Sequence, residues 1–340
     1  MGIEYAIIAD DFTGALDCST PFALSGLAVA AATRPEGLAE ALASGAEVVV
    51  VNTASRALAE AEAVRRVTAV AQQLRSAGPR IVFKKIDSRL KGNVRAETDA
   101  VAACFGHEAV VVAPAIPDQG RPTIGGTVTG RGVPAPLPIA PHVRPGALIA
   151  DAATDADLDR LVGAHDWSRH LAVGARGLGA AFARRHGPTS TRPFLPSPRT
   201  LFAIGSHDPI TLAQVERVRG RAPVHAAPLG NLAAEVAGLP AVIQSTGPFA
   251  GPDDAISRRF AAAVVGVVEA LRPDTLVMSG GDTALAILDA LGVGLVFPQG
   301  EAAPGLPWFL IKGQDRPSIR CVVKSGGFGG ADALAELLPK

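Results

Sequence analysis

The chain has 340 residues, enough for two domains of ordinary size, and 48 % of them are hydrophobic, so a sizeable buried core is expected. The 32 basic and 32 acidic residues balance, and an isoelectric point near 7.1 argues against nucleic-acid binding through overall charge. The three cysteines show no metal-ligand spacing, the first residues do not resemble a signal peptide, and the longest helix-like apolar stretch (260–271) is too short to cross a bilayer, so we expect a cytoplasmic protein without a membrane partner.

Apolar runs of strand length alternate with longer alanine-rich segments over the first third of the chain. The expected strands lie at 5–9, 48–52, 80–84 and 109–113. The expected helices between them lie at 13–25, 57–77 and about 93–105. Continuous apolar strands separated by helical lengths predict a parallel sheet that is covered on both faces.

Residues 114–146 differ from what precedes them, because 14 of these 33 positions are glycine or proline, which predicts an irregular loop or hairpin. After further strands expected at 147–151 and 171–175, residues 187–200 have the composition of a linker. The alternation then resumes, with strands expected at 201–205, 241–245, 275–279 and 321–325. We therefore predict two α/β domains with mainly parallel sheets, at 1–190 and 201–340.

Three polar clusters follow the expected strands of the first domain: Asp10–Asp11, the run from Lys84 to Asn93, and residues 114–123. Because parallel sheets bind ligands beyond the carboxyl ends of their strands, we expect the three clusters to line one rim. Adjacent residues leaving a strand point in different directions. One carboxylate of the pair is therefore expected to face the ligand and the other to cap the next helix, with a simple helix cap as the alternative.

Cationic side chains dominate the second cluster. Lys85, Arg89 and Lys91 are expected to form a positive pocket for a carboxylate or phosphate, in which Arg89 can bind through two hydrogen bonds. Arg121, between a glycine and a proline, adds a guanidinium on a stiff loop. The alternatives are a solvated surface run for the first group and a plain turn for Arg121.

The strand ends of the second domain carry glycine, serine and threonine instead of charge. One strand runs into Ser206 and Asp208, with Asp208 expected to cap a helix, and two others run into GGDTA (280–284) and GGFGG (326–330). Such loops let backbone N–H groups approach a polyphosphate closely, so three of them favour a nucleotide site; three tight turns are the alternative. The chain has neither a P-loop motif nor a strict G-x-G-x-x-G after a strand.

Six segments in this order resemble the signature segments of the four-carbon acid sugar kinase family, and they span almost the whole chain. They are ADDFTGALD (9–17), FKKIDSRLKGN (83–93), VVAPAIPDQGRPT (111–123), GSHDPITLAQ (205–214), SGGDTA (279–284) and VKSGGFG (323–329). The resemblance implies ATP-dependent phosphorylation of the terminal hydroxyl of a threonate, erythronate or oxo-tetronate. It places the sugar acid on the N-terminal domain, ATP on the C-terminal domain, and the active site in the cleft between them.

The family positions carry over residue by residue. On the sugar-acid side they are Asp10, Asp11, Lys85, Asp87, Arg89 and Arg121. On the ATP side they are Ser206, Gly280, Gly281, Asp282, Thr283, Gly326, Gly327, Phe328 and Gly329. Within this set, Asp11 is the first choice for the group that orients or deprotonates the hydroxyl and Asp87 the second, and Mg²⁺ is expected on phosphate oxygens and Asp282.

The chain also departs from the family. It looks several tens of residues shorter than usual members, and GGTVTGRGVP (125–134) stands where the family carries a histidine and a tyrosine. These departures leave the identity of the sugar acid undecided. The sequence also does not fix the oligomeric state, and a homodimer is one possibility. Two alternatives are a non-catalytic sugar-acid sensor and another nucleotide-dependent enzyme such as an NAD(P) oxidoreductase.

Overall fold

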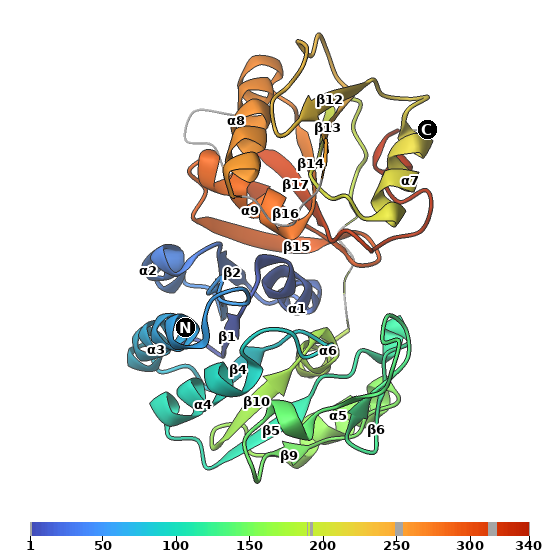
Figure 1. The fold of residues 1–340 in the computed structure, drawn as a ribbon. Coiled ribbons are helices and arrows are strands. Elements are labelled where there is room, and N and C mark those ends of the chain that lie inside the picture. The colour runs from blue at the N-terminus through green and yellow to red at the C-terminus, as the bar shows by residue number, and fades with distance from the viewer. Residues whose placement is uncertain (1, 189, 191–192, 249–253, 312–317, 340) are drawn as a thin grey trace. The chain divides into compact units, whose positions relative to one another are not determined.

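The computed structural model describes residues 2–188, 190, 193–248, 254–311 and 318–339. The chain falls into two units, Met1–Ser190 and Thr191–Lys340, and each has a mostly parallel set of paired strands with helices packed on it (Figure 1). The predicted α/β fold is therefore confirmed. Within the described residues, no helix combines the length and the apolar character needed to cross a membrane.

The main strands of the first unit run parallel, in the spatial order β2-β3-β1-β4-β10-β5-β9. Their central members are valine- and isoleucine-rich and buried along their whole length, as expected for a sheet covered on both faces. Their bounds are β1 Tyr5–Ala9, β2 Val29–Ala32, β3 Val48–Asn52, β4 Ile81–Lys85, β5 Ala109–Ala113, β9 Leu148–Ile149 and β10 His170–Gly174.

The helices of the first unit form two layers. α1 packs against α6, and α3 packs against α4. Because parallel crossovers are right-handed and the chain leaves β1 and β3 in opposite directions, these two pairs lie on opposite faces of the sheet. The bounds are α1 Phe12–Leu24, α2 Leu38–Ala43, α3 Glu60–Ser76, α4 Val94–Phe105, α5 Asp155–Ala164 and α6 Arg176–Arg184.

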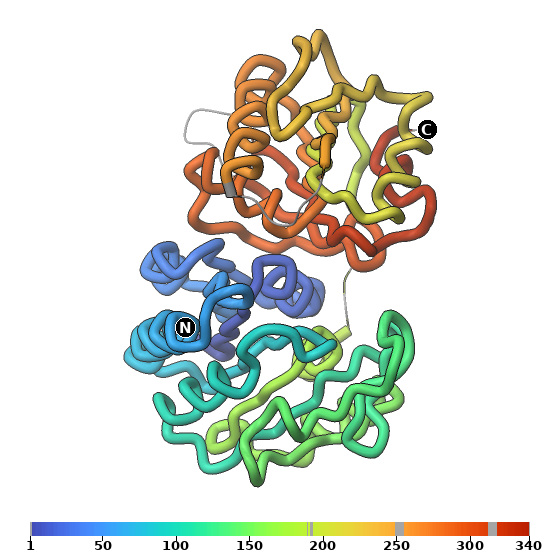
Figure 2. Tube along the Cα trace, viewed as in Figure 1, coloured from blue at the N-terminus to red at the C-terminus, as the bar shows by residue number. Residues whose placement is uncertain are grey.

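The glycine- and proline-rich segment 114–146 forms a small antiparallel sheet, β6-β7-β8, beside short 3₁₀ turns, as the hairpin alternative predicted. Figure 2 shows its winding path in green. An antiparallel bridge between Thr123 and Ala152 ties the segment to the chain that follows β9. The elements are η2 Pro117–Gln119, β6 Thr123–Ile124, β7 Thr127–Val128, β8 Leu137–Pro138 and η3 Ala140–His142.

The second unit has the spatial order β12-β13-β11-β14-β17-β16-β15, parallel up to β17 and antiparallel beyond it. Its strands are β11 Thr200–Ile204, β12 Val224–Pro228, β13 Ala241–Thr246, β14 Thr275–Ser279, β15 Leu295–Ala303, β16 Leu306–Ile311 and β17 Ile319–Lys324. Its helices are α7 Pro209–Val218, α8 Asp254–Leu271 and α9 Gly281–Ala290. The predicted linker 187–200 falls partly on residues outside the described ranges, and its described residues 193–199 form neither helix nor strand.

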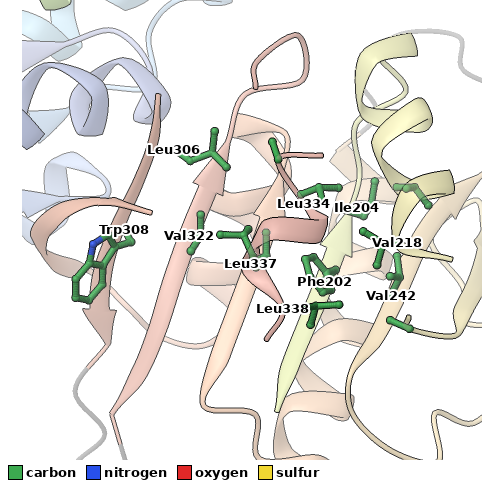
Figure 3. Close-up of a cluster of buried hydrophobic side chains, with 14 residues drawn as sticks. Phe202, Ile204, Val218, Val242, Leu306, Trp308, Val322, Leu334, Leu337 and Leu338 are labelled. Atoms are coloured by element: carbon green, nitrogen blue, oxygen red, sulfur yellow. The ribbon is translucent and has the colours of Figure 1, made fainter. Parts of the chain in front are cut away.

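The end of the chain completes the core of the second unit. Figure 3 shows Leu334, Leu337 and Leu338 lying against Phe202 and other side chains of the sheet. Leu334 and Leu337 are about 1 % exposed, and the 3₁₀ turn η4 (Ala335–Leu337) packs against α7. The end of the chain therefore packs on α7, the helix that follows the loop after β11.

Both units place the first strand of the unit between its third and fourth strands, as β3-β1-β4 and as β13-β11-β14. The chain therefore leaves the first strand in one direction and returns to its other side later. Loops that diverge from such a reversal point leave room at the carboxyl ends of the strands, which is where α/β proteins bind ligands.

Candidate functional site

Arg56 is the centre of the polar cluster in the first unit. Its Nε and Nη2 atoms donate to the two carboxylate oxygens of Asp10 at 2.9 and 2.8 Å, and Nη2 also donates to Asp11 Oδ1 at 2.7 Å. Its Nη1 lies 3.7 Å from Asp87 Oδ2. One guanidinium thus gathers three carboxylates that the sequence predicted for the sugar-acid side.

Sequence reasoning missed Arg56, although a signal was present. Arg56 follows the strand β3, as Asp10 follows β1, and β3 pairs with β1. The backbone N–H groups of Ser55 and Arg56 donate to the carbonyl of Asp10, which brings the two strand ends together. Applying the strand-end rule to the segment TASR (53–56) would have included this arginine.

The ionisation of Asp10 is fixed by its surroundings. Burial alone would raise the pKa of its carboxyl group, but Lys84, Arg56 and Lys85 together lower that pKa below its ordinary value. For Arg56, burial alone would lower the pKa, and the nearby carboxylates raise it instead. Asp10 and Arg56 are therefore both ionised, and their side chains are 4 % and 27 % exposed, respectively.

Of the two adjacent aspartates, Asp11 is the one that caps helix α1. Its Oδ1 accepts the backbone N–H of Gly14 at 3.1 Å, and its Oδ2 accepts the hydroxyl of Thr13 at 2.6 Å, at the N-terminus of α1. The expectation that one carboxylate caps the helix is confirmed. The side chain of Asp11 is nevertheless 23 % exposed, more than those of Asp10 (4 %) and Asp87 (16 %).

The two lysines that end β4 are both buried, with different partners. Lys84 Nζ lies 2.9 Å from Glu97 Oε2 in an ion pair in which both side chains are 1 % exposed. Lys85 is 4 % exposed, and its Nζ donates to the carbonyl of Ile86 at 2.8 Å. The β4 lysines therefore supply positive charge beneath the cluster, not at its surface.

Less buried positive charge comes from the loops beyond, where Arg121 is partly buried and Arg89 is exposed. Arg121 donates from Nη1 to Ser88 Oγ at 2.6 Å and from Nε to the carbonyl of Arg131 at 2.9 Å. Burial and then the charge of Arg89 lower the pKa of Arg121, while Asp87 opposes them. Arg89 is exposed, and its guanidinium has no hydrogen-bond or ion-pair partner among the described residues.

A second arginine that sequence reasoning missed follows β10. Arg176, the first residue of α6, donates from Nη1 to Asp17 Oδ1 at 2.9 Å, and its Nε lies 3.5 Å from Asp118 Oδ2. Its side chain is 12 % exposed. It links α1 to the 3₁₀ turn that precedes Arg121, and so helps to fix the rim of the site.

In the second unit, the loops after β11 and β14 meet. The N–H groups of Gly205 and Ser206 donate to the carbonyl of Ser279 at 3.0 and 3.1 Å. A side chain at Gly205 would collide with Thr283 on α9, so only glycine allows this approach. Gly280 has φ +107°, which also favours glycine, and α9 begins directly after it.

The turn after β17 reaches the same place. The N–H of Phe328 donates to the carbonyl of Ser325 at 3.1 Å, with Gly326 and Gly327 between them. A Cβ atom on Gly326 would lie 2.5 Å from Ser206 Oγ. Asp208 caps α7 by accepting the N–H of Ile210 at 2.9 Å, as predicted.

The predicted ATP-side residues divide into two sets. Ser206, Gly280, Thr283 and Gly326 converge, and Gly281 and the exposed Asp282 open α9 beside them. Gly327 follows Gly326 in the turn after β17, and a Cβ on it would lie 3.4 Å from Asp208 Oδ2. Phe328 and Gly329 lie further along this turn: a Cβ on Gly329 would meet Ala333 and Gln214, and the ring of Phe328 lies against Gly305. Among the described residues, no group of three or more histidine, cysteine or acidic side chains could hold a metal ion.

Comparison with known proteins assigns a domain family to each half of the chain. Residues 5–138 match the family model described as a sugar-binding N-terminal domain, and residues 236–334 match a nucleotide-binding C-terminal domain. The chain is 31 % identical to a D-threonate kinase of Bordetella bronchiseptica, over 98 % of this chain and 96 % of that protein. It is 27 % identical to a 3-oxo-tetronate kinase of Methylobacterium radiotolerans, over 99 % of each.

The fold is also shared with a solved structure. A Haemophilus influenzae protein superposes with a TM-score of 0.72 at 23 % sequence identity, covering 98 % of both chains. The alignments with the two kinases extend over 392 and 425 positions, so both relatives carry insertions that this 340-residue chain lacks. Matches over nearly the whole length, to kinases and to both domain models, confirm the resemblance carried by the six segments: the chain belongs to the four-carbon acid sugar kinase family.

Proposed function

We propose that the chain transfers the terminal phosphate of ATP to the terminal hydroxyl of a four-carbon sugar acid, such as threonate, erythronate or an oxo-tetronate. The observation that carries the proposal is the Arg56 cluster: three carboxylates on one guanidinium, next to an Arg89 without an acidic partner among the described residues. Such a site offers an anion-binding group and a hydroxyl-binding carboxylate together, as a sugar acid requires.

On the sugar-acid side, Arg89 and Arg121 bind the carboxylate of the substrate. Asp11 accepts the hydrogen bond of the attacking hydroxyl, because its carboxylate is the most exposed of the three on Arg56. Asp87 is the second choice for this role. Asp10 and Lys85 are buried, so they act by holding Arg56 and by contributing charge.

On the nucleotide side, the N–H groups of the turns at Gly280–Gly281 and Gly326–Gly327 bind the phosphates. Two observations fit this use: the turns converge at Ser206, and the start of α9 directs its first N–H groups toward the same place. Asp282 is exposed in the first turn of α9 and would hold Mg²⁺ together with phosphate oxygens. Mg²⁺ would neutralise phosphate charge when bound.

The residues of the chain thus contribute mainly by positioning and by charge neutralisation, which is most of what phosphoryl transfer asks of a protein. The acidic cluster orients one hydroxyl, and Arg89 fixes the opposite end of a short substrate. A substrate without the carboxylate would lose the second contact and with it the orientation.

The test is release of ADP from ATP and Mg²⁺ in the presence of D-threonate, D-erythronate and 3-oxo-tetronates, each against the sugar alcohol that lacks the carboxylate. We expect ADP release only with a sugar acid, and its loss in Asp11→Asn. A protein that binds sugar acids, shown by a thermal shift, but releases no ADP would be a sensor instead. Protection by NAD(P) and not by ATP would indicate a different nucleotide-dependent enzyme.

The same proposal includes a cytoplasmic enzyme with small-molecule substrates and a homodimer in solution. A Bordetella bronchiseptica protein that is 28 % identical, with a TM-score of 0.50, was crystallised as a domain-swapped dimer with bound citrate. Light scattering on the purified chain would measure its mass directly, and a monomer at micromolar concentration would remove the dimer from the proposal.

A further inference from the structure

A fully buried lysine lies under the turn after β17. Lys324 is the last residue of β17, and its side chain is 0 % exposed. Its Nζ donates to Thr211 Oγ1 at 2.8 Å, to the carbonyl of Gly326 at 2.9 Å and to the carbonyl of Ser325 at 3.1 Å. All three donors of the ammonium group are therefore used, two of them on successive peptide groups of the turn.

These bonds determine which way the turn presents its backbone. A trans peptide group directs its carbonyl and the following N–H to opposite sides. The carbonyls of Ser325 and Gly326 point inward to Lys324, so the N–H groups of Gly326 and Gly327 point outward. Neither N–H has an acceptor among the described residues. Two adjacent outward N–H groups form a concave site for an anion.

The charge of Lys324 acts in the same direction. In the first unit, the buried Lys84 is paired with Glu97 at 2.9 Å, whereas Lys324 has no ion-pair partner among the described residues. Asp208, which caps α7, is the charged group that faces Lys324. Burial lowers the pKa of Lys324 to about 8, and the charge of Asp208 offsets only part of that lowering. Within the described parts of the chain, a positive charge without a paired acid thus lies directly beneath two N–H groups that have no acceptor.

We propose that Lys324 is the positioning residue of the phosphate site: by holding the carbonyls of Ser325 and Gly326 inward, it presents the N–H groups of Gly326 and Gly327 to a phosphate of the nucleotide. The inference rests on the proposed function, because it assigns the anion to ATP. It adds a residue that touches no phosphate itself and on which the shape and the charge of the turn depend.

The first test is Lys324→Met, which keeps the length and bulk of the side chain and removes the ammonium group. Calorimetric titration with ADP and Mg²⁺ is expected to show binding weakened about tenfold or more, since the turn loses both its anchor and its charge. The KM for ATP should rise while the KM for the sugar acid stays within about twofold of wild type. A folded variant that binds ADP like the wild type would overturn the inference.

A pH profile separates this role from a merely structural one. Raising the pH from 7 to 9 should weaken ADP binding to the wild type, because the ammonium of Lys324 then loses its proton. The affinity of Lys324→Met should show no such fall over that range. Parallel profiles for the two proteins would contradict the inference.

Thr211 provides a second route should Lys324→Met fail to fold. Thr211 Oγ1 accepts from Lys324 and donates to the carbonyl of Gly326 at 2.6 Å. Thr211→Val removes that link and is expected to weaken ADP binding about threefold or more, whereas Thr211→Ser keeps the hydroxyl and the affinity. Equal affinities in the two variants would overturn the inference. A wild type that binds no ADP would instead refute the proposed function.

Discussion

The two units share the same reversal of strand order but carry different residues at the ends of their strands. Each places its first strand between its third and fourth strands and gathers polar groups at the carboxyl ends, yet the first unit gathers charges and the second gathers glycines. In the first, three carboxylates share Arg56; in the second, loops approach so closely that a side chain at Gly205 would not fit. Topology thus provides the place for a site, and the residues at the strand ends decide what it binds.

The difference has a consequence for mutations. A charged cluster depends on pairing, so the loss of one member leaves the others unpaired in a partly buried place. A backbone site depends on close approach, so the gain of a small side chain is what damages it. Changes within the Arg56 cluster should therefore cost both stability and activity, and changes in the glycine turns should cost mainly nucleotide affinity.

The largest effect is expected from Arg56→Met. The variant leaves Asp10 buried without its partner, which should lower the free energy of unfolding by about 3–5 kcal/mol. It also releases Asp11 and Asp87, which should lower kcat/KM at least about a hundredfold. The matched control is Arg66→Met, because Arg66 donates to carbonyls of the same loop (Thr53 and Ala54) and not to the cluster. Denaturant unfolding and steady-state kinetics measure both quantities, and equal stability of the two variants would show that the cluster is not held by pairing.

Arg89→Ala should have the next largest effect. An exposed guanidinium that binds the substrate carboxylate contributes about 1.5–3 kcal/mol, so the KM for the sugar acid should rise about 10- to 100-fold. The KM for ATP and the melting temperature should not change. Arg95→Ala serves as the control, because it removes an exposed charge that lies on α4, close in sequence, and is paired with Asp99 at 3.8 Å. Similar KM values for the two variants would mean that overall charge, and not a contact from Arg89, attracts the substrate.

Gly326→Ala should have a smaller effect, confined to the nucleotide. The added Cβ would lie 2.5 Å from Ser206 Oγ, so either that hydroxyl or the turn must shift within the phosphate site, and we expect the KM for ATP to rise about tenfold. Gly330→Ala is the control, because a Cβ there would meet no atom of the described residues within 4 Å and the backbone needs no positive φ. An equal response of the two variants would refute the convergence of the glycine turns at a phosphate site.

The sequence was sufficient to predict what depends on single strands and their ends. The strands at 5–9, 48–52, 109–113 and 275–279 were placed at their observed bounds, because each is a short apolar run of strand length that is separated from the next by a helical length. The cap at Asp208 followed from local chemistry in the same way. The strand β2 was missed since its sequence, VAAA, has a helical preference that the neighbouring β3 overrides.

What depends on the spatial order of the strands was out of reach. Arg56 joins the site because β3 pairs with β1, and Arg176 joins it because β10 lies between β4 and β5, although it comes much later in the chain. Lys324 looked like the end of a strand, and its role emerges only from Thr211, which lies 113 residues away on α7. Strand ends name candidates, but the pairing of strands decides which of them meet.

The smallest predicted effect is a loss of stability at low pH that is confined to the first unit. It arises from histidines at the amino ends of the strands, at the opposite end of the sheet from the Arg56 cluster. His107 and His170 lie at the amino ends of β5 and β10, and the ring of His165 is 5.4 Å from that of His170. Burial, then His170 and Arg144, lower the pKa of His107 to about 4.

Because the unfolded chain takes up this proton near pH 6.5 and the folded chain only near pH 4, the unfolded state binds more protons between these values, and stability must fall as the pH falls through that window. Because the side chain of His107 is only half-buried and water screens its charge, the expected loss of stability is about 1–2 kcal/mol. On going from pH 7 to pH 5, hydrogen exchange should therefore show that protection is lost in β5 and β10 and retained in β11 and β14. His107→Gln should remove most of this pH-dependent loss of protection. Equal losses in the two units would mean that acid sensitivity does not arise from the histidines of the first unit.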